Sequence, residues 1–263
     1  MTPSRVLACG LLAAALASAP ALAQRGQRGQ LPPLNPRAGS PKDFTGYWVS
    51  IVTEDWRWRM VTPAKGDYDS VPLNAEGRRV ADTWNPQGDE TAGEACRSYA
   101  APAIMRVPGH LHITWENDTT LRIDTDAGTQ TRLLRFGEAG RGQSAAAPSG
   151  EPGWQGVSTA QWELGGRAGM FGGPPPKPSG ALKVVTTRIR PGYLRKNGVP
   201  FSANALLTEY FNVLGPEENG DVWLVVTTIV QDPQFLNGRF FTSSHFKKMP
   251  DGSRWRPTPC LAS

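Results

Sequence analysis

A succession of short segments rich in Val, Ile, Thr and aromatic residues is the feature of this sequence that most constrains its fold. Segments of this composition, bounded by turn-forming residues, are typical of β-strands. Only Asn74 to Trp84 has the pattern of a helix, with Asn74 as its N-cap. The predicted strands are Gly46–Val52, Trp56–Val61, Ala103–Val107, His110–Glu116, Thr120–Thr125, Thr129–Phe136, Val157–Leu164, Leu182–Arg190, Leu206–Val213, Val222–Val230 and Arg239–Lys247.

No period recurs along the chain, which argues against a solenoid or a propeller. About ten strands joined mostly by short turns predict an antiparallel meander that closes into a barrel or folds into a sandwich. Closure leaves no exposed strand edge, so we predict an all-β barrel of about 8–10 strands with one short helix. Two Gly/Pro-rich segments, 137–153 and 165–180, are predicted as long surface loops, with a lid over a pocket as the alternative.

The first 23 residues have the pattern of a secretory signal peptide. Arg5 precedes an apolar run from Val6 to Ala19, and Ala21-Leu22-Ala23 forms a small-x-small cleavage site. The run is shorter than the roughly 20 residues that a membrane-spanning helix needs. We therefore predict export to the periplasm or secretion, no membrane span, a disordered lead-in over residues 24–42 and a single barrel domain over residues 43–263.

Charge and cysteine content narrow the range of partners. Without residues 1–23 the chain has 27 basic and 23 acidic residues, and the basic residues are scattered. A nucleic acid is therefore not an expected partner, because its recognition requires clustered positive charge. Cys96 and Cys260 are the cysteines that remain, and in an oxidising compartment such a pair is expected to form a disulfide rather than a reactive thiol.

The segment from His110 to Asp126 is predicted as a hairpin whose register is set by its apolar residues. A three-residue turn at 117–119 places Trp115 opposite Leu121 and Ile113 opposite Ile123. A two-residue turn would mix apolar and polar residues on one face. With the three-residue turn, the polar face pairs Glu116 with Thr120, His112 with Asp124 and His110 with Asp126.

Three histidines are candidate metal ligands. His110 and His112 project to one side of a strand, and closure of the barrel would bring the late strand that carries His245 near them. Asp124 and Asp126 would then orient the imidazoles. Such a site would bind zinc or a similar divalent metal. The alternative is a solvent-facing surface on which His and Asp side chains pair across strands.

A second candidate site is an apolar pocket lined by large aromatic side chains. If residues 53–60 are extended, Trp56, Trp58 and Met60 share one face and Asp55, Arg57 and Arg59 share the other. Aromatic rings can stack on a flat ligand in a pocket, and core packing is their more common use. The predicted ligand-binding residues are Trp48, Trp56, Trp58, Trp154 and Tyr193, with Arg59 or Arg106 as a polar anchor.

The segment from Pro191 to Pro200 is predicted as a loop. Its Asn197-Gly198 pair is a strong turn signal. Such a loop would carry Tyr193 and Arg195 toward the rim of a pocket, or would serve only as a connection between strands.

The sequence contains no landmark of a familiar catalytic class. There is no Gly-x-Ser-x-Gly elbow, no phosphate-binding Gly-rich loop with Lys-Ser/Thr and no Cys-x-x-Cys pair. Glu54 and Glu163 are candidates for an acid/base pair, or for the general base of the metal site, but no spacing requires that role. Whether the protein is an enzyme stays open at this point.

Two resemblances add to these expectations. Gly46-Tyr47-Trp48 on the first predicted strand resembles the Gly-x-Trp start of lipocalins and related calycin barrels, and a late cysteine such as Cys260, tied back to the barrel, is similar to their layout. From Cys96 to Cys260 the chain resembles a family of exported bacterial proteins of unknown function, which implies export and an all-β fold but no catalytic residues. The motifs that carry this resemblance are Trp154-x-Gly156-x-Ser158-x-x-x-Trp162-Glu163, Leu182-Lys183-Val184-Val185-Thr186-Thr187, Gly198-x-Pro200-x-Ser202 and Thr208-Glu209-Tyr210-Phe211.

Three functions are consistent with these patterns. The first is an exported, lipocalin-like barrel that binds a small, largely apolar or aromatic molecule. The second is a metal-dependent hydrolase, lyase or isomerase that uses the three-histidine site. The third is an accessory protein of the cell envelope without a small-molecule ligand.

Overall fold

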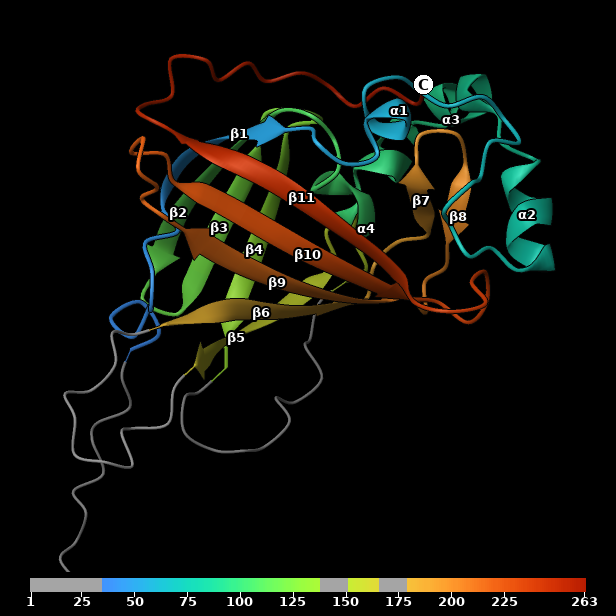
Figure 1. Ribbon diagram of the computed structural model, residues 1–263. Coiled ribbons are helices and arrows are strands. Elements are labelled where there is room, and N and C mark those ends of the chain that lie inside the picture. The colour runs from blue at the N-terminus through green and yellow to red at the C-terminus, as the bar shows by residue number, and fades with distance from the viewer. Residues whose placement is uncertain (1–34, 138–150, 166–178) are drawn as a thin grey trace, which may run out of the picture. The chain divides into compact units, whose positions relative to one another are not determined.

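Nine strands close into a barrel in the computed structural model of the protein (Figure 1). Around the barrel the strands follow the order β1-β11-β10-β9-β6-β5-β4-β3-β2, and β2 pairs with β1. The predicted all-β barrel is therefore confirmed. The strand bounds are β1 (Gly46–Ile51), β2 (His110–Asn117), β3 (Thr120–Thr125), β4 (Gln130–Phe136), β5 (Val157–Gly165), β6 (Ser179–Thr187), β9 (Leu206–Leu214), β10 (Trp223–Gln231) and β11 (Phe240–Met249).

The structure describes residues 35–137, 151–165 and 179–263. All of them belong to one unit, Pro33–Ser263. The predicted signal peptide, the first part of the predicted lead-in and most of the two predicted Gly/Pro-rich loops lie outside the described residues.

Closure of the barrel depends on β1, which pairs with β2 on one side and with β11 on the other. The first and last strands are thus neighbours, as the sequence predicts. One pair departs from the predicted antiparallel meander. Strands β4 and β5 run parallel, with Leu134 opposite Ser158 and Phe136 opposite Ala160.

The register of the hairpin β2–β3 is confirmed for its apolar and polar pairs. Trp115 lies opposite Leu121, Ile113 opposite Ile123 and His112 opposite Asp124. Near the turn, a bulge between Trp115 and Asn117 brings Asn117 rather than Glu116 opposite Thr120. The bulge adds one residue to β2, so the turn is shorter than predicted while the rest of the register is kept.

Large apolar side chains fill the barrel interior. Trp48 of β1 and Phe211 of β9 are fully buried there, and the Trp48 indole nitrogen donates a hydrogen bond to the Phe44 carbonyl oxygen at 3.0 Å. A barrel of about eight strands has an interior only wide enough for side chains or one small ligand. The prediction of Trp48 as a ligand-binding residue is therefore corrected, because its ring is part of the core.

A buried ion pair spans the interior beside this core. Arg132 of β4 donates two hydrogen bonds to Glu209 of β9, Nη1 to Oε1 at 3.0 Å and Nη2 to Oε2 at 2.5 Å. Both side chains are 0 % exposed. The sheet places β5 and β6 between these two strands, so the pair joins strands that are not adjacent.

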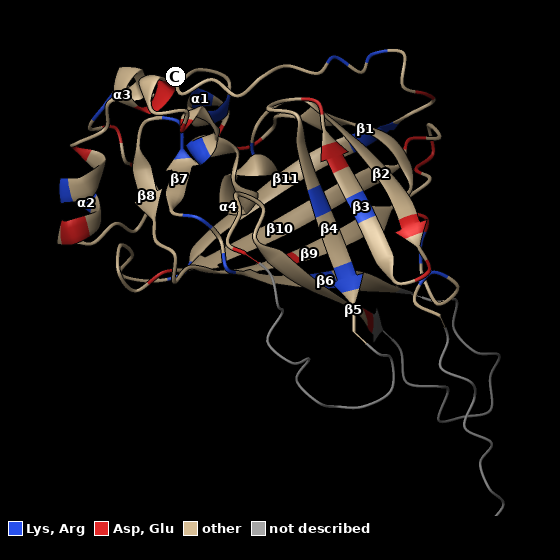
Figure 2. Cartoon of the chain, turned by 180° about the vertical axis from the view of Figure 1, so that it is seen from behind, with Lys and Arg blue, Asp and Glu red and all other residues tan. Residues whose placement is uncertain are grey.

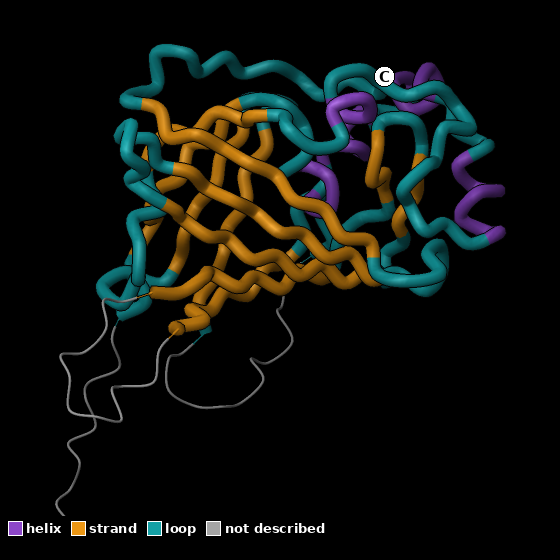
Figure 3. Tube along the Cα trace, viewed as in Figure 1, coloured by secondary structure: helices purple, strands orange, loops and turns teal. Residues whose placement is uncertain are grey.

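The helices and a small hairpin gather at one end of the barrel (Figure 3). An apolar cluster joins them to the barrel, in which Leu194 and Phe201 of the hairpin pack with Val230 and Phe240. Among the described residues, no helix has the length and hydropathy needed to cross a membrane. The elements are α1 (Trp56–Arg59), α2 (Ala75–Ala81), α3 (Pro86–Thr91), the 3₁₀ helix η1 (Ala95–Tyr99), α4 (Ala101–Ile104), β7 (Gly192–Arg195) and β8 (Val199–Phe201).

The predicted helix is confirmed as α2, whose N-cap Asn74 accepts a hydrogen bond from the Gly77 backbone N–H at 2.8 Å. The hairpin β7–β8 lies where a loop was predicted, and its turn contains Gly198 at φ 83°. An Asn-Gly pair permits such a turn because glycine adopts positive φ without strain.

Two predicted strands, Trp56–Val61 and Ala103–Val107, are wrong, because each segment forms a helical turn instead. Pro102, which directly precedes the second segment, lies in the first turn of α4, a position that suits its fixed φ and missing N–H. The same signal, Asn85 followed by Pro86, begins α3. Strand propensity of aromatic and β-branched residues largely reflects packing, and here tertiary contacts favour helical turns.

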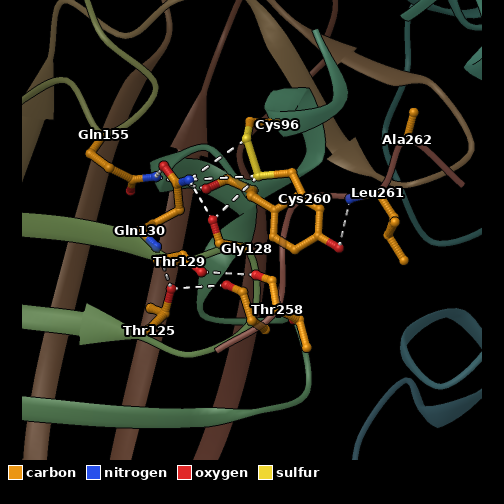
Figure 4. The surroundings of a disulfide bond; sticks show 12 residues. Cys96, Thr125, Gly128, Thr129, Gln130, Gln155, Thr258, Cys260, Leu261 and Ala262 are labelled. Atoms are coloured by element: carbon orange, nitrogen blue, oxygen red, sulfur yellow. Dashed lines mark hydrogen bonds between the residues drawn. A yellow bond between two sulfur atoms is a disulfide. The ribbon is translucent and has the colours of Figure 1, made fainter. Parts of the chain in front are cut away.

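The predicted disulfide joins Cys96 of η1 to Cys260 near the C-terminus, with Cα atoms 5.1 Å apart (Figure 4). The Gln130 side-chain amide lies beside both sulfur atoms, 3.7 Å from Cys96 Sγ and 3.6 Å from Cys260 Sγ. The bond holds the C-terminal segment beside the turn that joins β3 and β4, where Thr258 forms a bridge to Ala127.

The last part of the predicted lead-in is ordered against the barrel, so the prediction of disorder is corrected for residues 35–42. Asn35 accepts a hydrogen bond from the Arg37 backbone N–H at 2.9 Å, which stabilises a turn. The Pro36 carbonyl oxygen accepts a hydrogen bond from the Trp162 indole at 2.8 Å. The turn and the contact with Trp162 offset the entropy lost when the segment is ordered. The composition of the segment alone does not predict this stabilisation.

Candidate ligand-binding site

A cavity of about 300 Å³ lies outside the barrel, between the helical end and the hairpin β7–β8. We call it the arginine pocket, because Arg59, Arg106 and Arg195 line it together with Trp58 and Tyr99. Lys196 is also part of its wall. Among the described residues, four basic side chains and no acidic one line the pocket, so its wall is positive, although Arg59 and Arg106 are also paired with Glu54 and Asp55.

Helix α1 positions Trp58 and Arg59. Asp55, at φ 52°, turns the chain from β1 into this helix, and the Met60 backbone N–H donates to the Trp56 carbonyl oxygen at 2.9 Å. In a helix, residues two apart do not face each other. Arg57 is therefore exposed and paired with Asp67, whereas Arg59 turns inward.

Arg59 is held by three partners. Its Nε donates to the Arg106 carbonyl oxygen at 2.9 Å, its Nη1 donates to Glu54 Oε1, and its Nη2 lies 3.4 Å from Ser50 Oγ. Burial lowers the pKa of Arg59, although the charge of Glu54 acts against this. Arg59 thus ties α1 to the segment that carries Arg106.

Arg106 and Arg195 are buried but incompletely paired. Arg106 is 5 % exposed, and its Nη1 lies 3.0 Å from Asp55 Oδ2 without hydrogen-bond geometry. Arg195 is 4 % exposed, and its Nη2 donates to Ser70 Oγ at 2.7 Å. Among the described residues, Arg106 Nη1 and Nη2 and Arg195 Nε and Nη1 have no hydrogen-bond partner.

The burial of several positive charges close together lowers the pKa of Arg195. Burial, and next the nearby charge of Arg106, lower the pKa of Arg195 to about 10. Its guanidinium carbon lies 4.6 Å from the centre of the Trp58 ring, which provides a cation–π contact. Lys and Arg positions of α1 and β7 lie side by side in Figure 2. An anion entering the pocket would relieve the repulsion between these charges.

Of the predicted ligand-binding residues, the structure brings Trp58, Arg59 and Arg106 together in this pocket. Trp56 lies next to it on α1, with 66 % of its surface exposed. Trp154 and Tyr193 do not line it. The Trp154 ring instead packs under Arg190, and the Tyr193 hydroxyl donates to Asp89 Oδ2 at 2.8 Å. The prediction that these two residues bind the ligand is therefore corrected, since their side chains make contacts within the protein.

The pocket also contains residues that the sequence did not single out, Tyr99 and Lys196 above all. Arg195 was expected only near a rim. The Asn197-Gly198 pair is a signal for a hairpin turn, and a hairpin at this position places Arg195 on a short strand. Nothing in the sequence shows that this strand lies against α1.

The three histidines are not brought together. All lie on the outer face of the barrel, where His110 Nδ1 is 2.7 Å from Asp126 Oδ2, His112 stacks on Tyr47 and His245 Nδ1 is 2.9 Å from Glu54 Oε2. Within residues 35–137, 151–165 and 179–263, no group of three or more His, Cys, Asp or Glu side chains is placed to hold a metal ion. The predicted zinc site of His110, His112 and His245 is therefore wrong, because β1 lies between the strands that carry them and the three rings do not converge on one point.

Glu54 and Glu163 do not form an acid/base pair. In the barrel, β2, β3 and β4 separate β1, which Glu54 follows, from β5, which carries Glu163. Glu163 is partly exposed and paired with Lys183. Burial opposes the ionisation of Glu54, but contacts with Thr53, Arg59 and His245 outweigh it and hold the pKa of Glu54 below its ordinary value. A carboxylate held ionised in this way positions Arg59 and His245.

A second cavity of about 330 Å³ lies on the outer face of the barrel, where Trp255 meets Tyr47 and His112 edge-on. Two charged residues of its lining, Arg122 and Asp124, are paired, since Arg122 Nε donates to Asp124 Oδ2 at 2.8 Å. The arginine pocket, in which Arg106 and Arg195 keep buried donors without hydrogen-bond partners, is the stronger candidate site.

No family model matches the chain, and no curated protein or solved structure is significantly similar to it. The resemblances to calycin barrels and to an exported bacterial family therefore stay predictions. The geometry of the arginine pocket is the basis for a function.

Proposed function

We propose that the protein binds a small organic anion with an apolar or aromatic body in the arginine pocket. The observation that carries this proposal is the pair of buried side chains Arg106 and Arg195, each of which has two guanidinium nitrogens without a hydrogen-bond partner among the described residues. Leaving buried donors without partners is costly. Such a pair in the wall of a cavity is therefore typical of a site that a ligand completes.

The rest of the lining supports the same ligand chemistry. Val107 and Leu194 offer apolar surface, and Trp58 offers an aromatic ring. A guanidinium group can donate two parallel hydrogen bonds to a carboxylate or phosphate, which fixes the orientation of the anion. The proposed ligand thus keeps the apolar or aromatic body expected from the sequence and carries an anionic group in addition. Its site lies outside the barrel rather than inside it.

Titration with benzoate and with its neutral analogue benzamide tests the proposal. Both probes present the same ring, so their difference reports the anionic group. Hydrogen bonds to charged groups contribute about 1.5–3 kcal/mol. Benzoate is therefore expected to bind at least about tenfold more tightly than benzamide in calorimetric titrations.

The Arg195→Gln variant is expected to lose about tenfold or more of the benzoate affinity while benzamide binding changes little. Arg79→Gln is the matched control, because it removes an exposed, ion-paired arginine of α2 that does not line the pocket. Thermal unfolding of each variant checks that the fold is kept, and Arg106→Gln provides a second test if Arg195→Gln is unstable.

Equal binding of benzoate and benzamide, or equal losses in Arg195→Gln and Arg79→Gln, would contradict a specific anion site. Absence of binding by benzoate, inorganic phosphate and benzamide alike would instead favour an accessory protein without a small-molecule ligand.

We also propose that the chain is exported with residues 1–23 as its signal peptide. The Cys96–Cys260 disulfide supports an oxidising compartment. Expressed at full length in a Gram-negative host, the protein is expected in the periplasmic fraction with Gln24 as its N-terminal residue. An Ala23→Lys variant, which destroys the small-x-small site, is expected to stay uncleaved. Recovery of an unprocessed chain from the cytoplasm would refute export.

A further inference from the structure

We infer that the bound anion is amphipathic, a long-chain carboxylate whose head enters the arginine pocket and whose hydrocarbon chain leaves it over Trp56, Met60 and Val61. We call these three residues the apolar patch. The inference rests on the proposed function, since the same pocket would hold the anionic head.

The apolar patch is exposed and continuous with the pocket. Trp56, Met60 and Val61 are 66 %, 58 % and 67 % exposed, values unusual for side chains of this size. Trp56 begins α1 and Met60, four residues later, is its C-cap in helical conformation, so the two side chains share one face. Met60 and Val61 also line the pocket, so apolar surface leads from the cavity out onto the helix.

The position of the charges favours an amphiphile over other occupants. Arg106 and Arg195, whose guanidinium groups keep unpaired donors, are 4–5 % exposed, so an anion has to enter the cavity to reach them. The charges of a bilayer stay in the plane of its surface, whereas a free carboxylate can enter head first. A single molecule with an anionic head and an apolar chain matches both the buried cations and the exposed patch beside them.

Chain length is the quantity that tests this inference. Calorimetric titrations with butyrate, hexanoate, octanoate and decanoate, at one pH and below the concentrations at which they form micelles, report how affinity depends on the chain. Full burial of one methylene group is worth about fourfold in affinity, and a chain lying on an open surface is expected to gain about twofold for each methylene. The dissociation constant should therefore fall steadily to decanoate.

The Trp56→Ser variant distinguishes the contribution of the hydrocarbon chain to affinity from that of the carboxylate head. Trp56 does not line the pocket, so butyrate affinity is expected to stay within about twofold while decanoate affinity falls about fivefold or more. Phe241→Ser is the matched control, because Phe241 is a comparably exposed apolar residue, at 57 %, that lines neither cavity. It is expected to leave the whole series unchanged.

The possible results distinguish this inference from the proposed function. If benzoate and butyrate bind but affinity does not rise with chain length, the amphipathic ligand is refuted and the anion site stands. If neither binds, both fail. If vesicles containing an anionic phospholipid bind in a Trp56-dependent manner and decanoate does not, the patch contacts membranes and the inference is overturned.

Discussion

The Glu209→Leu variant is expected to lose about 3–5 kcal/mol of unfolding free energy, because it leaves the Arg132 guanidinium buried without its counter-charge. Both side chains are 0 % exposed, so water cannot replace the missing carboxylate. The loss should be larger than for a typical core substitution to a residue of similar volume, which costs under about 1.5 kcal/mol.

Replacing both partners tests the reason for this loss. The Arg132→Met/Glu209→Leu double variant removes both charges together, and such replacements of buried ion pairs are often neutral or stabilising. We expect its unfolding free energy to return close to that of the unsubstituted protein. Part of the barrel interior beside the pair is already apolar, since Leu207 and Phe211 flank Glu209 on the same strand face.

Urea denaturation of the two single variants and the double variant provides the measurement. The coupling energy from this cycle isolates the pair from the effect of each substitution alone. A loss below about 1 kcal/mol in Glu209→Leu would mean that water or another group satisfies Arg132 when the carboxylate is absent.

Removal of the disulfide is expected to have the second large effect. The bond closes a loop over a sequence separation of 164 residues. Loop entropy of the unfolded chain gives an upper value of about 5 kcal/mol, and native disulfides typically contribute about 2–4 kcal/mol. The Cys96→Ala/Cys260→Ala variant is therefore expected to lose a few kcal/mol of stability.

The disulfide also connects to the candidate site. Tyr99 and Thr258, which lie close in sequence to the two cysteines, both line the arginine pocket. The double variant is thus expected to bind benzoate more weakly as well as to unfold more easily.

Guanidinium chloride denaturation of the variant, with and without a thiol reductant, measures the effect. The native protein with reductant is the matched control, because it loses the same bond without substitution. If the oxidised protein and the variant had equal midpoints, the C-terminal segment would be held by its other contacts, such as the hydrogen bond from Thr129 Oγ1 to the Thr258 carbonyl oxygen.

The sequence by itself determined the fold class, the disulfide and the register of the hairpin β2–β3. These follow from local rules. Alternation with period two assigns Ile113 and Ile123 to the core, and a one-residue slip would bury His112 and Asp124 instead. Asn74 capped its helix as its side-chain chemistry dictates.

Only the tertiary structure decided where the candidate site lies. Arg59 ends α1, Arg195 ends β7 and Arg106 follows α4, and nothing local in the sequence indicates that these three segments meet outside the barrel. The same holds for the histidines, since β1 lies between β2, which carries His110 and His112, and β11, which carries His245. Contacts between residues far apart in the chain depend on how the whole core packs, and packing selected a helical turn at Trp56–Arg59 where composition indicated a strand.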